Sequence, residues 1–204
     1  MQRFLTLGPG TNHDVVVRRL LAFHGADSCP LGFVENAPEG FELLLAGRAE
    51  FFVLCSVHPR ASRLLCEYAG KVFIVDTFIA PSKKLAILSR AGVARPRKLG
   101  LFEATVGLAP TARWQEVVVE TDGTLATVGA KLLAGVYDSA LTYRDLADAH
   151  SDELTVDAEI ESPDDAWLVL ARDRAAKSGL VASRTGAVAR ALAAGHAVRD
   201  GNIK

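Results

Sequence analysis

The chain has 204 residues, half of them apolar and 23% charged, which suffices for one domain or two small lobes and excludes a disordered chain. Its mean hydropathy is +0.19, but no stretch approaches the roughly 18 uninterrupted apolar residues that span a bilayer. Lysine and arginine number 23 against 24 acidic residues, so the net charge of −1 gives no general attraction to nucleic acid or to an anionic membrane.

Short apolar strands alternate with helices in the first part of the chain. The pattern predicts strands at 4–7, 31–34 and 51–55, and helices at 14–24 and from 36 to about 46. Thr11 or Asn12 can cap the first helix, while Pro38 lies near the start of the second, which ends before Gly47. The order β-α-β-α-β with an apolar third strand is typical of a sheet covered on both faces.

The rest of the chain repeats this alternation. Extended segments are predicted at 72–79, 85–88, 99–102, 117–119, 139–141, 155–160 and 167–171, and helices at 125–133 and 144–149. From Arg172 onward Ala, Gly, Ser and Arg dominate, and we interpret this part as a C-terminal appendage with one helix at 187–194.

Charge is distributed unevenly along the chain. Residues 77–102 contain six cations and no acid, whereas residues 145–165 contain nine acids and no Lys or Arg. Two interpretations are open at this stage. The segments are either two solvated faces of one globule, or a cationic wall beside a site for an anionic ligand.

The turn at residues 7–12, Leu-Gly-Pro-Gly-Thr-Asn, is the strongest local feature. A strand that runs through a glycine-rich turn into a helix directs free backbone N–H groups at a carboxylate or phosphate. The turn is neither a Walker loop nor a dinucleotide fingerprint, because no Gly-Lys-Ser/Thr follows and position 13 is His13 instead of a third glycine. A tight turn with an N-cap is the purely structural alternative.

Similar strand-to-helix turns are predicted at residues 120–124 and at Thr142-Tyr143. Two such turns that face each other across a cleft can hold a small dianion, although each can also be an ordinary N-cap. A nucleophilic triad is not expected, since the chain has no G-x-S-x-G motif and no Ser or Cys in a recognisable pattern with His and a carboxylate.

The three cysteines, an odd number without a C-x-x-C motif, suit reduced thiols in a reducing compartment. Cys55, His58 and Cys66 have some resemblance to a zinc site, but Cys55 ends an apolar strand, where a buried thiol is the usual interpretation. No metal is therefore expected. The glycine turn begins too early for a signal peptide, so we expect a cytoplasmic protein.

The glycine turn resembles the Leu-Gly-Pro-Glu-Gly-Thr opening of prephenate dehydratase catalytic domains, shortened by one residue. Residues 51–59 stand where that family has a Gly-Val-Val-Pro-Ile-Glu-Asn-Ser segment, and residues 77–88 stand where strands link its two lobes. Residues 122–127 and 138–147 fall near its Ser-Thr helix start and its later strand-helix pair. The resemblance covers about residues 4–171. It implies an α/β, two-lobed fold like that of type II periplasmic-binding proteins, with mixed sheets and a ligand cleft between the lobes.

The chain departs from this family before its last strand. The family has a Thr-Arg-Phe triplet there, in which the Thr assists departure of hydroxide and the Arg binds carboxylate, whereas this chain has Asp165-Ala166-Trp167. Ordinary dehydration is therefore not expected. We also expect no regulatory ACT domain, because 33 residues follow Ala171. A short chain that keeps the glycine turn and loses the triplet resembles the prephenate decarboxylases of antibiotic pathways, typified by the bacilysin-pathway enzyme.

The resemblance implies one lobe from residues 1–80 plus 162–204 and another from 84–160, with hinges near Pro81-Ser82 and Glu161–Pro163. It implies a cofactor-independent lyase that decarboxylates prephenate or a related cyclic keto-dicarboxylate without aromatising it. The alternatives are a divergent prephenate dehydratase and a non-catalytic protein that binds a small carboxylate.

In this interpretation the glycine turn binds one carboxylate and the 123–124 turn binds the other end. Thr77, Ser82 or Lys84 contacts the ring hydroxyl or a charge of the ligand. The expected partner is a small anionic carboxylate, without nucleic acid or membrane, and a homodimer is left open. No catalytic residue is assigned. The expected substrate-binding residues are Gly8, Gly10, Thr11, Asn12, Thr77, Ser82, Lys84, Gly123, Thr124 and Thr142.

Overall fold

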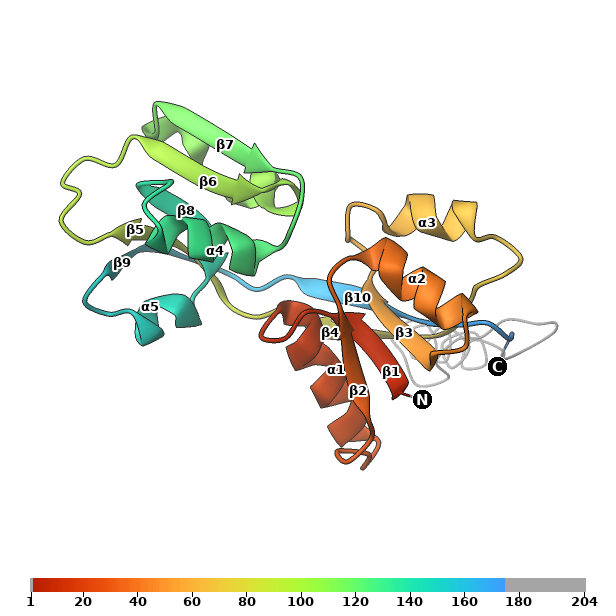
Figure 1. Ribbon diagram of the computed structural model, residues 1–204. Coiled ribbons are helices and arrows are strands. Elements are labelled where there is room, and N and C mark those ends of the chain that lie inside the picture. The colour runs from red at the N-terminus through yellow and green to blue at the C-terminus, as the bar shows by residue number, and fades with distance from the viewer. Residues whose placement is uncertain (1, 175–204) are drawn as a thin grey trace, which may run out of the picture. The chain divides into compact units, whose positions relative to one another are not determined.

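The computed structural model describes residues 2–174, which contain two five-stranded sheets (Figure 1). The first sheet has the order β2-β1-β3-β10-β4. Strand β1 pairs in parallel with β2 and β3, and β10 runs antiparallel to both β3 and β4. The strands are β1 (Gln2–Leu7), β2 (Leu31–Val34), β3 (Ala49–Cys55), β4 (Phe73–Pro81) and β10 (Asp164–Ala171).

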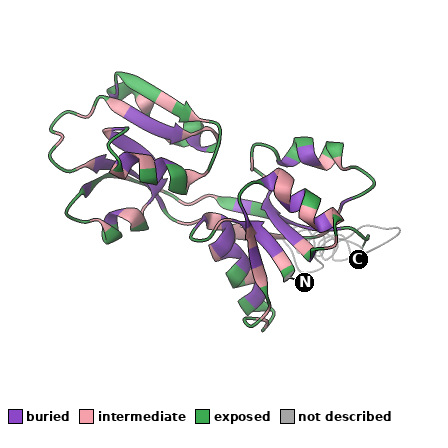
Figure 2. Ribbon diagram, in the orientation of Figure 1, coloured by how far each residue is buried: buried purple, intermediate pink, exposed green. Residues whose placement is uncertain are grey.

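Helices cover both faces of the first sheet, because its central strands are apolar on both sides. Successive side chains of β3 alternate between the faces: Phe52 and Leu54 pack with α2 (Ala37–Leu45) and α3 (Ala61–Glu67), and Val53 and Cys55 pack with α1 (Asn12–Phe23). Figure 2 shows the buried residues concentrated along these central strands.

The second sheet has the order β7-β6-β8-β5-β9 and is also mixed. Strand β6 is parallel to β7 and β8, while β5 is antiparallel to β8 and β9. Helices α4 (Leu125–Leu133) and α5 (Asp145–Ala149) pack on one face, and Trp114 packs on the other. The strands are β5 (Leu85–Arg90), β6 (Lys98–Phe102), β7 (Glu116–Glu120), β8 (Ser139–Tyr143) and β9 (Leu154–Ile160).

The predicted α/β fold with two lobes and mixed sheets is confirmed, as are the strands and helices predicted up to Ala171. Sequence reasoning missed α3 and the 3-10 helices at Glu103–Leu108 and Thr111–Arg113, which are too short for a helical apolar period to stand out. The predicted turn at Thr142-Tyr143 is wrong. Both residues belong to β8, whose five residues are all buried. The predicted helix at 187–194 lies outside the described residues.

The two segments that link the sheets lie side by side. The Ser82 N–H donates to the Pro163 carbonyl at 3.1 Å, and the Ser162 hydroxyl donates to the carbonyl of Lys83 at 3.0 Å. Residues up to Arg174 form one compact unit, so the lobe boundaries at 80, 84, 160 and 162 stay a prediction. Among the described residues, no helix is long and apolar enough to cross a membrane.

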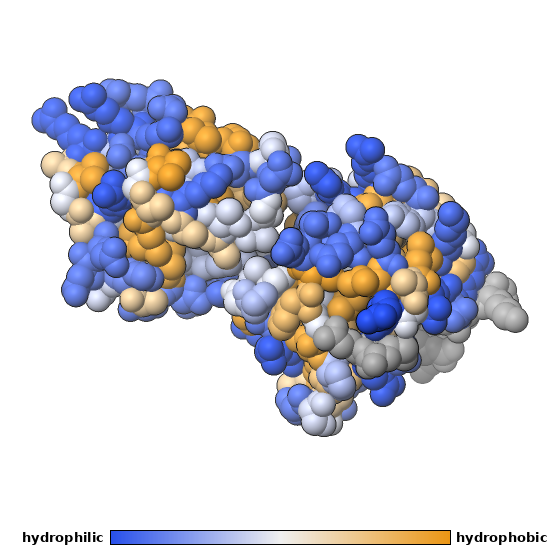
Figure 3. Space-filling view, in the orientation of Figure 1, coloured by the Kyte–Doolittle hydropathy of each residue, from blue (hydrophilic) through white to orange (hydrophobic). Residues whose placement is uncertain are grey.

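Polar and charged residues cover much of the face seen in Figure 3, with apolar residues in patches between them. Large apolar side chains that are exposed include Phe23 and Ile79. Such scattered apolar exposure is ordinary for a protein surface.

One glycine in each sheet region makes room for an aromatic ring. A Cβ atom built on Gly40 of α2 would lie 2.4 Å from the ring of Phe52, and one built on Gly100 of β6 would lie 2.4 Å from the ring of Tyr137. Both rings are fully buried, so neither can move into solvent. Close packing around both rings therefore depends on the missing side chain at these positions.

We predict that Gly100→Ala lowers the free energy of unfolding by about 1–3 kcal/mol, because the added methyl group overpacks the core against Tyr137. Urea denaturation followed by circular dichroism measures this change. The matched control is Gly107→Ala, where the added Cβ meets no atom within 4 Å. Equal stability of the two variants would contradict the packing role of Gly100.

Candidate functional site

The carboxyl ends of the parallel strands carry the candidate site in both lobes. Strands β1, β2 and β3 share one direction, as do β6, β7 and β8, so the segments after each trio gather at one sheet edge. Ligands of open α/β sheets bind at such edges.

A cavity of about 270 Å³, here called the inner cavity, lies among these segments. Its wall is mainly apolar, and the polar side chains in it come from both lobes. The apolar wall includes Leu7, Val57, Leu85, Phe102, Leu108 and Leu125, and the polar lining consists of Thr11, Asn12, His13, Cys55, His58, Ser82, Thr105, Thr124, Tyr143 and Asp165.

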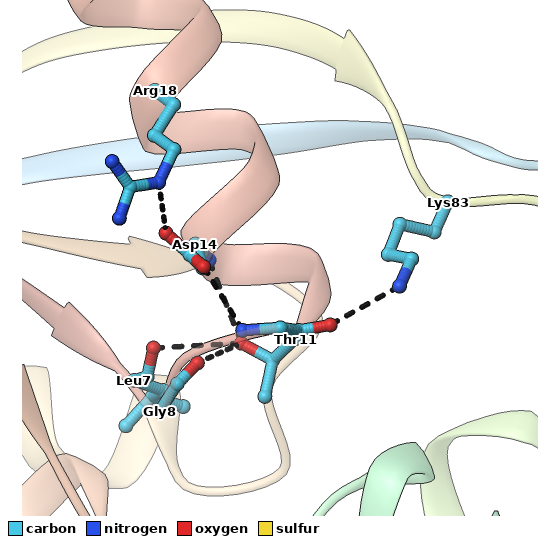
Figure 4. A network of polar contacts seen from close by, with 7 residues as sticks. Leu7, Gly8, Thr11, Asp14, Arg18 and Lys83 are labelled. Carbon is cyan, nitrogen blue, oxygen red and sulfur yellow. Dashed lines mark hydrogen bonds and ion pairs between the residues drawn. The ribbon is translucent and has the colours of Figure 1, made fainter.

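The glycine turn is held by its own hydrogen bonds (Figure 4). The Thr11 hydroxyl donates to the Gly8 carbonyl at 2.7 Å, and the Gly10 N–H donates to the Asp14 carboxylate at 2.9 Å. Asp14 is also paired with Arg18 at 2.7 Å. The Gly10 N–H is therefore already used inside the turn, where Gly10 adopts a φ of 74° that favours glycine.

Asn12 joins the glycine turn to the hinge and to the second lobe. Its backbone N–H donates to the Tyr143 hydroxyl at 2.9 Å, and its side-chain amide donates to the Ser82 hydroxyl at 2.7 Å. Its side-chain oxygen accepts from the Lys83 N–H at 2.9 Å. The Ser82 hydroxyl in turn donates to Asp165. Asn12 thus links the start of α1 to the 82–83 segment through its side chain and to β8 through its backbone N–H.

The structure brings half of the predicted site residues together. Thr11, Asn12, Ser82, Gly123 and Thr124 line the inner cavity. The other five predicted residues do not line it: Gly8, Gly10, Thr77, Lys84 and Thr142.

Two of these outlying residues have a clear structural place. Thr77 is an exposed residue of β4, opposite Leu168 in the sheet register. The Thr142 hydroxyl is buried and donates to the Leu125 carbonyl at 2.7 Å, which positions α4 on β8.

Two histidines that the sequence offered no reason to pair lie at the inner cavity, with ring centroids 6.2 Å apart. Burial, followed by the charge on His58, lowers the pKa of His13 to about 3. Burial, followed by the charge of Arg60, lowers the pKa of His58 to about 4. Both imidazoles are therefore neutral at pH 7. His58 Nδ1 accepts from the Arg60 N–H at 3.2 Å, which places its ring proton on Nε2.

The remaining titratable groups of the inner cavity are a thiol, a phenol and one acidic residue, none of which carries a positive charge. Burial raises the pKa of the Cys55 thiol to about 12 and that of the Tyr143 hydroxyl to about 12, so both stay protonated at pH 7. Asp165 is 8% exposed and is the one Asp, Glu, Lys or Arg in the lining. The inner cavity thus offers neutral donors and one carboxylate. Cys55 is a poor nucleophile there, because the reactive form is the thiolate.

The six cations at residues 77–102 do not line the inner cavity, so they form no cationic wall around it. Lys83 is used elsewhere: its ammonium group pairs with Asp145 at 2.8 Å, donates to the Gly10 carbonyl at 3.1 Å and lies 4.2 Å from the centre of the Tyr143 ring. Within residues 2–174, no group of three or more His, Cys, Asp or Glu side chains is arranged to hold a metal ion.

The structure resolves the triplet that replaces Thr-Arg-Phe. Asp165 faces the inner cavity, Ala166 is exposed, and Trp167 is fully buried with its ring 5.0 Å from that of His13. An acidic side chain therefore lies at the cleft where the resemblance would place a Thr.

No family model matches the sequence, and no curated protein is significantly similar to it. Solved structures do share its fold. A prephenate dehydratase from Arthrobacter aurescens, solved in complex with L-Phe, matches 90% of this chain with a TM-score of 0.62 and 18% identity. This chain spans 63% of the length of that dehydratase.

Two further solved structures are also similar in fold. One is the periplasmic domain of BvgS from Bordetella pertussis, with a TM-score of 0.52 and 13% identity. The match covers 83% of this chain and 36% of the BvgS chain. The other is an ABC transporter from Parabacteroides distasonis, with a TM-score of 0.51 and 13% identity. The match covers 85% of this chain and 66% of the transporter chain. The chain therefore has a prephenate dehydratase-like fold that it shares with periplasmic-binding-protein-like structures.

Stability should fall steeply on mild acidification because His13 is buried as a neutral imidazole. Its pKa is about 3 in the folded protein and about 6.5 in the unfolded chain, so between these values the unfolded chain binds the extra proton. Lowering the pH from 7 to 5 should remove about 2 kcal/mol of stability through this group. Urea denaturation at both pH values measures the loss.

The variant His13→Gln should lose less stability than the wild type over the same interval, because the titrating group is gone. His24→Gln, which removes an exposed imidazole, is the matched control and should keep the wild-type dependence. His58, Cys55 and Asp165 remain in both proteins. If the stability of His13→Gln depended on pH as that of the wild type does, His13 would not be the group whose burial causes the loss of stability.

Proposed function

We propose that the chain is a cofactor-independent lyase that removes carbon dioxide from prephenate or a related cyclic keto-dicarboxylate and retains the ring hydroxyl, as in the bacilysin-pathway class of decarboxylases. The prephenate dehydratase-like fold supports the substrate class, and the composition of the inner cavity supports the reaction. The observation that carries the proposal is an apolar cavity with neutral donors and a single carboxylate, Asp165, in its lining.

Such a cavity favours loss of a carboxylate from a ring carbon. An apolar wall solvates an anion poorly, and the negative charge of Asp165 repels it, whereas carbon dioxide is neutral. The bond between the ring carbon and the carboxylate breaks, and its electron pair shifts into the ring diene, which takes one proton at a ring carbon. The reaction therefore needs a proton donor but no redox partner.

Tyr143 is the lining group that can donate that proton at pH 7. It accepts from the Asn12 N–H, so its own proton is free for a ligand, and its raised pKa keeps the hydroxyl protonated. His58 is a neutral imidazole with its ring proton on Nε2, so it can donate a hydrogen bond to a bound carboxylate. The keto-acid arm would bind at the Gly123-Thr124 turn, where α4 begins with Thr124 as its cap.

Dehydration is less well supported by this geometry. Dehydratases use a Thr before the last strand to assist the leaving hydroxide, and at that position this chain has Asp165, which accepts a hydrogen bond from Ser82 as a carboxylate would and so offers no proton there. A non-catalytic carboxylate-binding protein is the second candidate, supported by the periplasmic-binding-protein-like structures of the same fold.

Mass spectrometry after incubation with prephenate separates the three functions. We expect a product lighter than prephenate by carbon dioxide alone. Loss of both carbon dioxide and water would identify a dehydratase, and an unchanged mass with saturable binding would identify a binding protein. Heated protein serves as the control, because prephenate also decomposes without a catalyst.

Asp165→Asn should lower both kcat and KM for prephenate. The amide keeps an acceptor for Ser82 but removes the repulsion of the ring carboxylate, which relieves ground-state strain. A decrease of about tenfold in kcat, equivalent to about 1.4 kcal/mol, is expected in a continuous assay of carbon dioxide release. The neighbouring exposed residue provides the control Asp164→Asn, which should leave both constants unchanged. A higher kcat in Asp165→Asn would overturn the role given to this carboxylate.

A further inference from the structure

A second cavity of about 510 Å³, here called the outer cavity, continues from the inner one. The two cavities share six lining residues, namely Leu7, His58, Pro59, Phe102, Gly123 and Thr124, so they are parts of one cleft. Their lining differs in charge. The inner cavity has no Lys or Arg, whereas Arg60 lines the outer cavity and is the one such residue in the lining of either.

Arg60 is placed at the junction of the cavities by its backbone. Its N–H donates to Nδ1 of His58 at 3.2 Å, and His58 belongs to the lining of both cavities. Its guanidinium reaches across the cleft to Asp122, in the turn before α4, at 3.6 Å. This ion pair joins a residue before α3 to the 121–124 turn of the other lobe.

We propose that Arg60 binds the arm carboxylate of a ligand whose ring occupies the inner cavity, and that this carboxylate replaces Asp122 as the partner of Arg60. The inference rests on the proposed function, since it assigns the second carboxylate of the same substrate. It makes Arg60 the residue that selects ring compounds with an acidic arm over ring acids without one.

The pair with Asp122 is a weak competitor for such a ligand. The Asp122 side chain is 88% exposed and that of Arg60 is 56% exposed, and their separation exceeds the 2.7–2.9 Å typical of a charge-assisted hydrogen bond. Exposed pairs of this kind contribute about 0.2–1 kcal/mol. A carboxylate fixed in the cleft by its ring can approach the planar guanidinium with two parallel hydrogen bonds, which Arg forms better than Lys.

The other charges around Arg60 limit the outer cavity to one carboxylate. Glu35 and Glu103 also line this cavity, and neither pairs with Arg60. Their charge repels a second anion. The ring carboxylate of a dicarboxylate is therefore directed into the inner cavity, where the proposed bond cleavage occurs.

Two ligands separate the arm from the ring carboxylate. Phenylpyruvate has the acidic arm but no carboxylate on its ring, and benzoate has a ring carboxylate but no arm. Titration calorimetry on the full chain should show that Arg60→Gln weakens phenylpyruvate binding by tenfold or more, about 1.4 kcal/mol, and leaves benzoate binding unchanged. Arg63→Gln, in the helix α3 that begins directly after Arg60, is the matched control: Arg63 is paired with Glu67, and the variant should bind both ligands as the wild type does.

Asp122→Asn provides an opposite test that does not remove the binding residue. Because the competitor is lost, phenylpyruvate affinity should rise by about two- to fivefold, the equivalent of an exposed ion pair. Arg60→Lys should retain part of the affinity, since the charge stays while the planar fork is lost. Circular dichroism and thermal melting establish that each variant is folded.

The results distinguish this inference from the proposed function. If the wild type binds phenylpyruvate and Arg60→Gln binds it equally well, Arg60 is not the arm-carboxylate residue, and the lyase proposal stands on its own test with prephenate. If the wild type binds no phenylpyruvate, this inference fails whatever the prephenate assay gives. Unchanged affinity in Asp122→Asn would refute the competition between Asp122 and the ligand.

Discussion

Strand β10 runs antiparallel between β3 and β4, and the candidate site depends on that insertion. Alternation along the strand places Asp165, Trp167 and Val169 on the face that α1 covers. Trp167 is fully buried there against His13, and its indole N–H donates to the Ala80 carbonyl at 3.4 Å. Two residues earlier, Asp165 therefore points to the start of α1 and into the inner cavity. The same insertion brings residues 162–163 beside 82–83 and makes a paired connection between the sheets.

Asn12 fixes the positions of the site residues next to this paired connection. Hydrogen bonds from its backbone and side chain reach Tyr143, Ser82 and Lys83, three residues that are at least 70 positions away in sequence. Hydrogen bonds are directional and strengthen when they are partly buried. These bonds, together with the one from Ser82 to Asp165, therefore fix where the Tyr143 hydroxyl and the Asp165 carboxylate lie relative to each other. The glycine turn therefore contributes mainly through the helix start that it sets up, because its own Gly10 N–H is used by Asp14.

The cleft separates charge along its length. The inner cavity contains two neutral histidines, a protonated thiol and a protonated phenol, all kept uncharged by burial. The outer cavity is polar and contains Arg60 among three acids, Glu35, Glu103 and Asp122. A cyclic dicarboxylate whose arm lies at Arg60 and whose ring lies in the inner cavity has a counter-charge for its arm carboxylate alone, and loss of carbon dioxide removes the other charge. This is the physical link between the proposed reaction and the proposed role of Arg60.

The sequence by itself determined the alternation of strands and helices and the helix starts near residues 11–12 and 122–124, because apolar periodicity and capping are local properties. The two-lobed fold class followed from the resemblance to prephenate dehydratases. It also indicated that the residues replacing the family triplet matter. Only the tertiary structure decided which residues meet at the cleft. His13, the segment from His58 to Arg60, and Tyr143 lie far apart along the chain, and they converge through strand order and the pairing of β10, which no local pattern encodes. For the same reason Thr77 and Thr142, which the sequence predicted as substrate-binding residues, have structural places in the sheets instead: Thr77 lies opposite Leu168, and Thr142 bonds to Leu125.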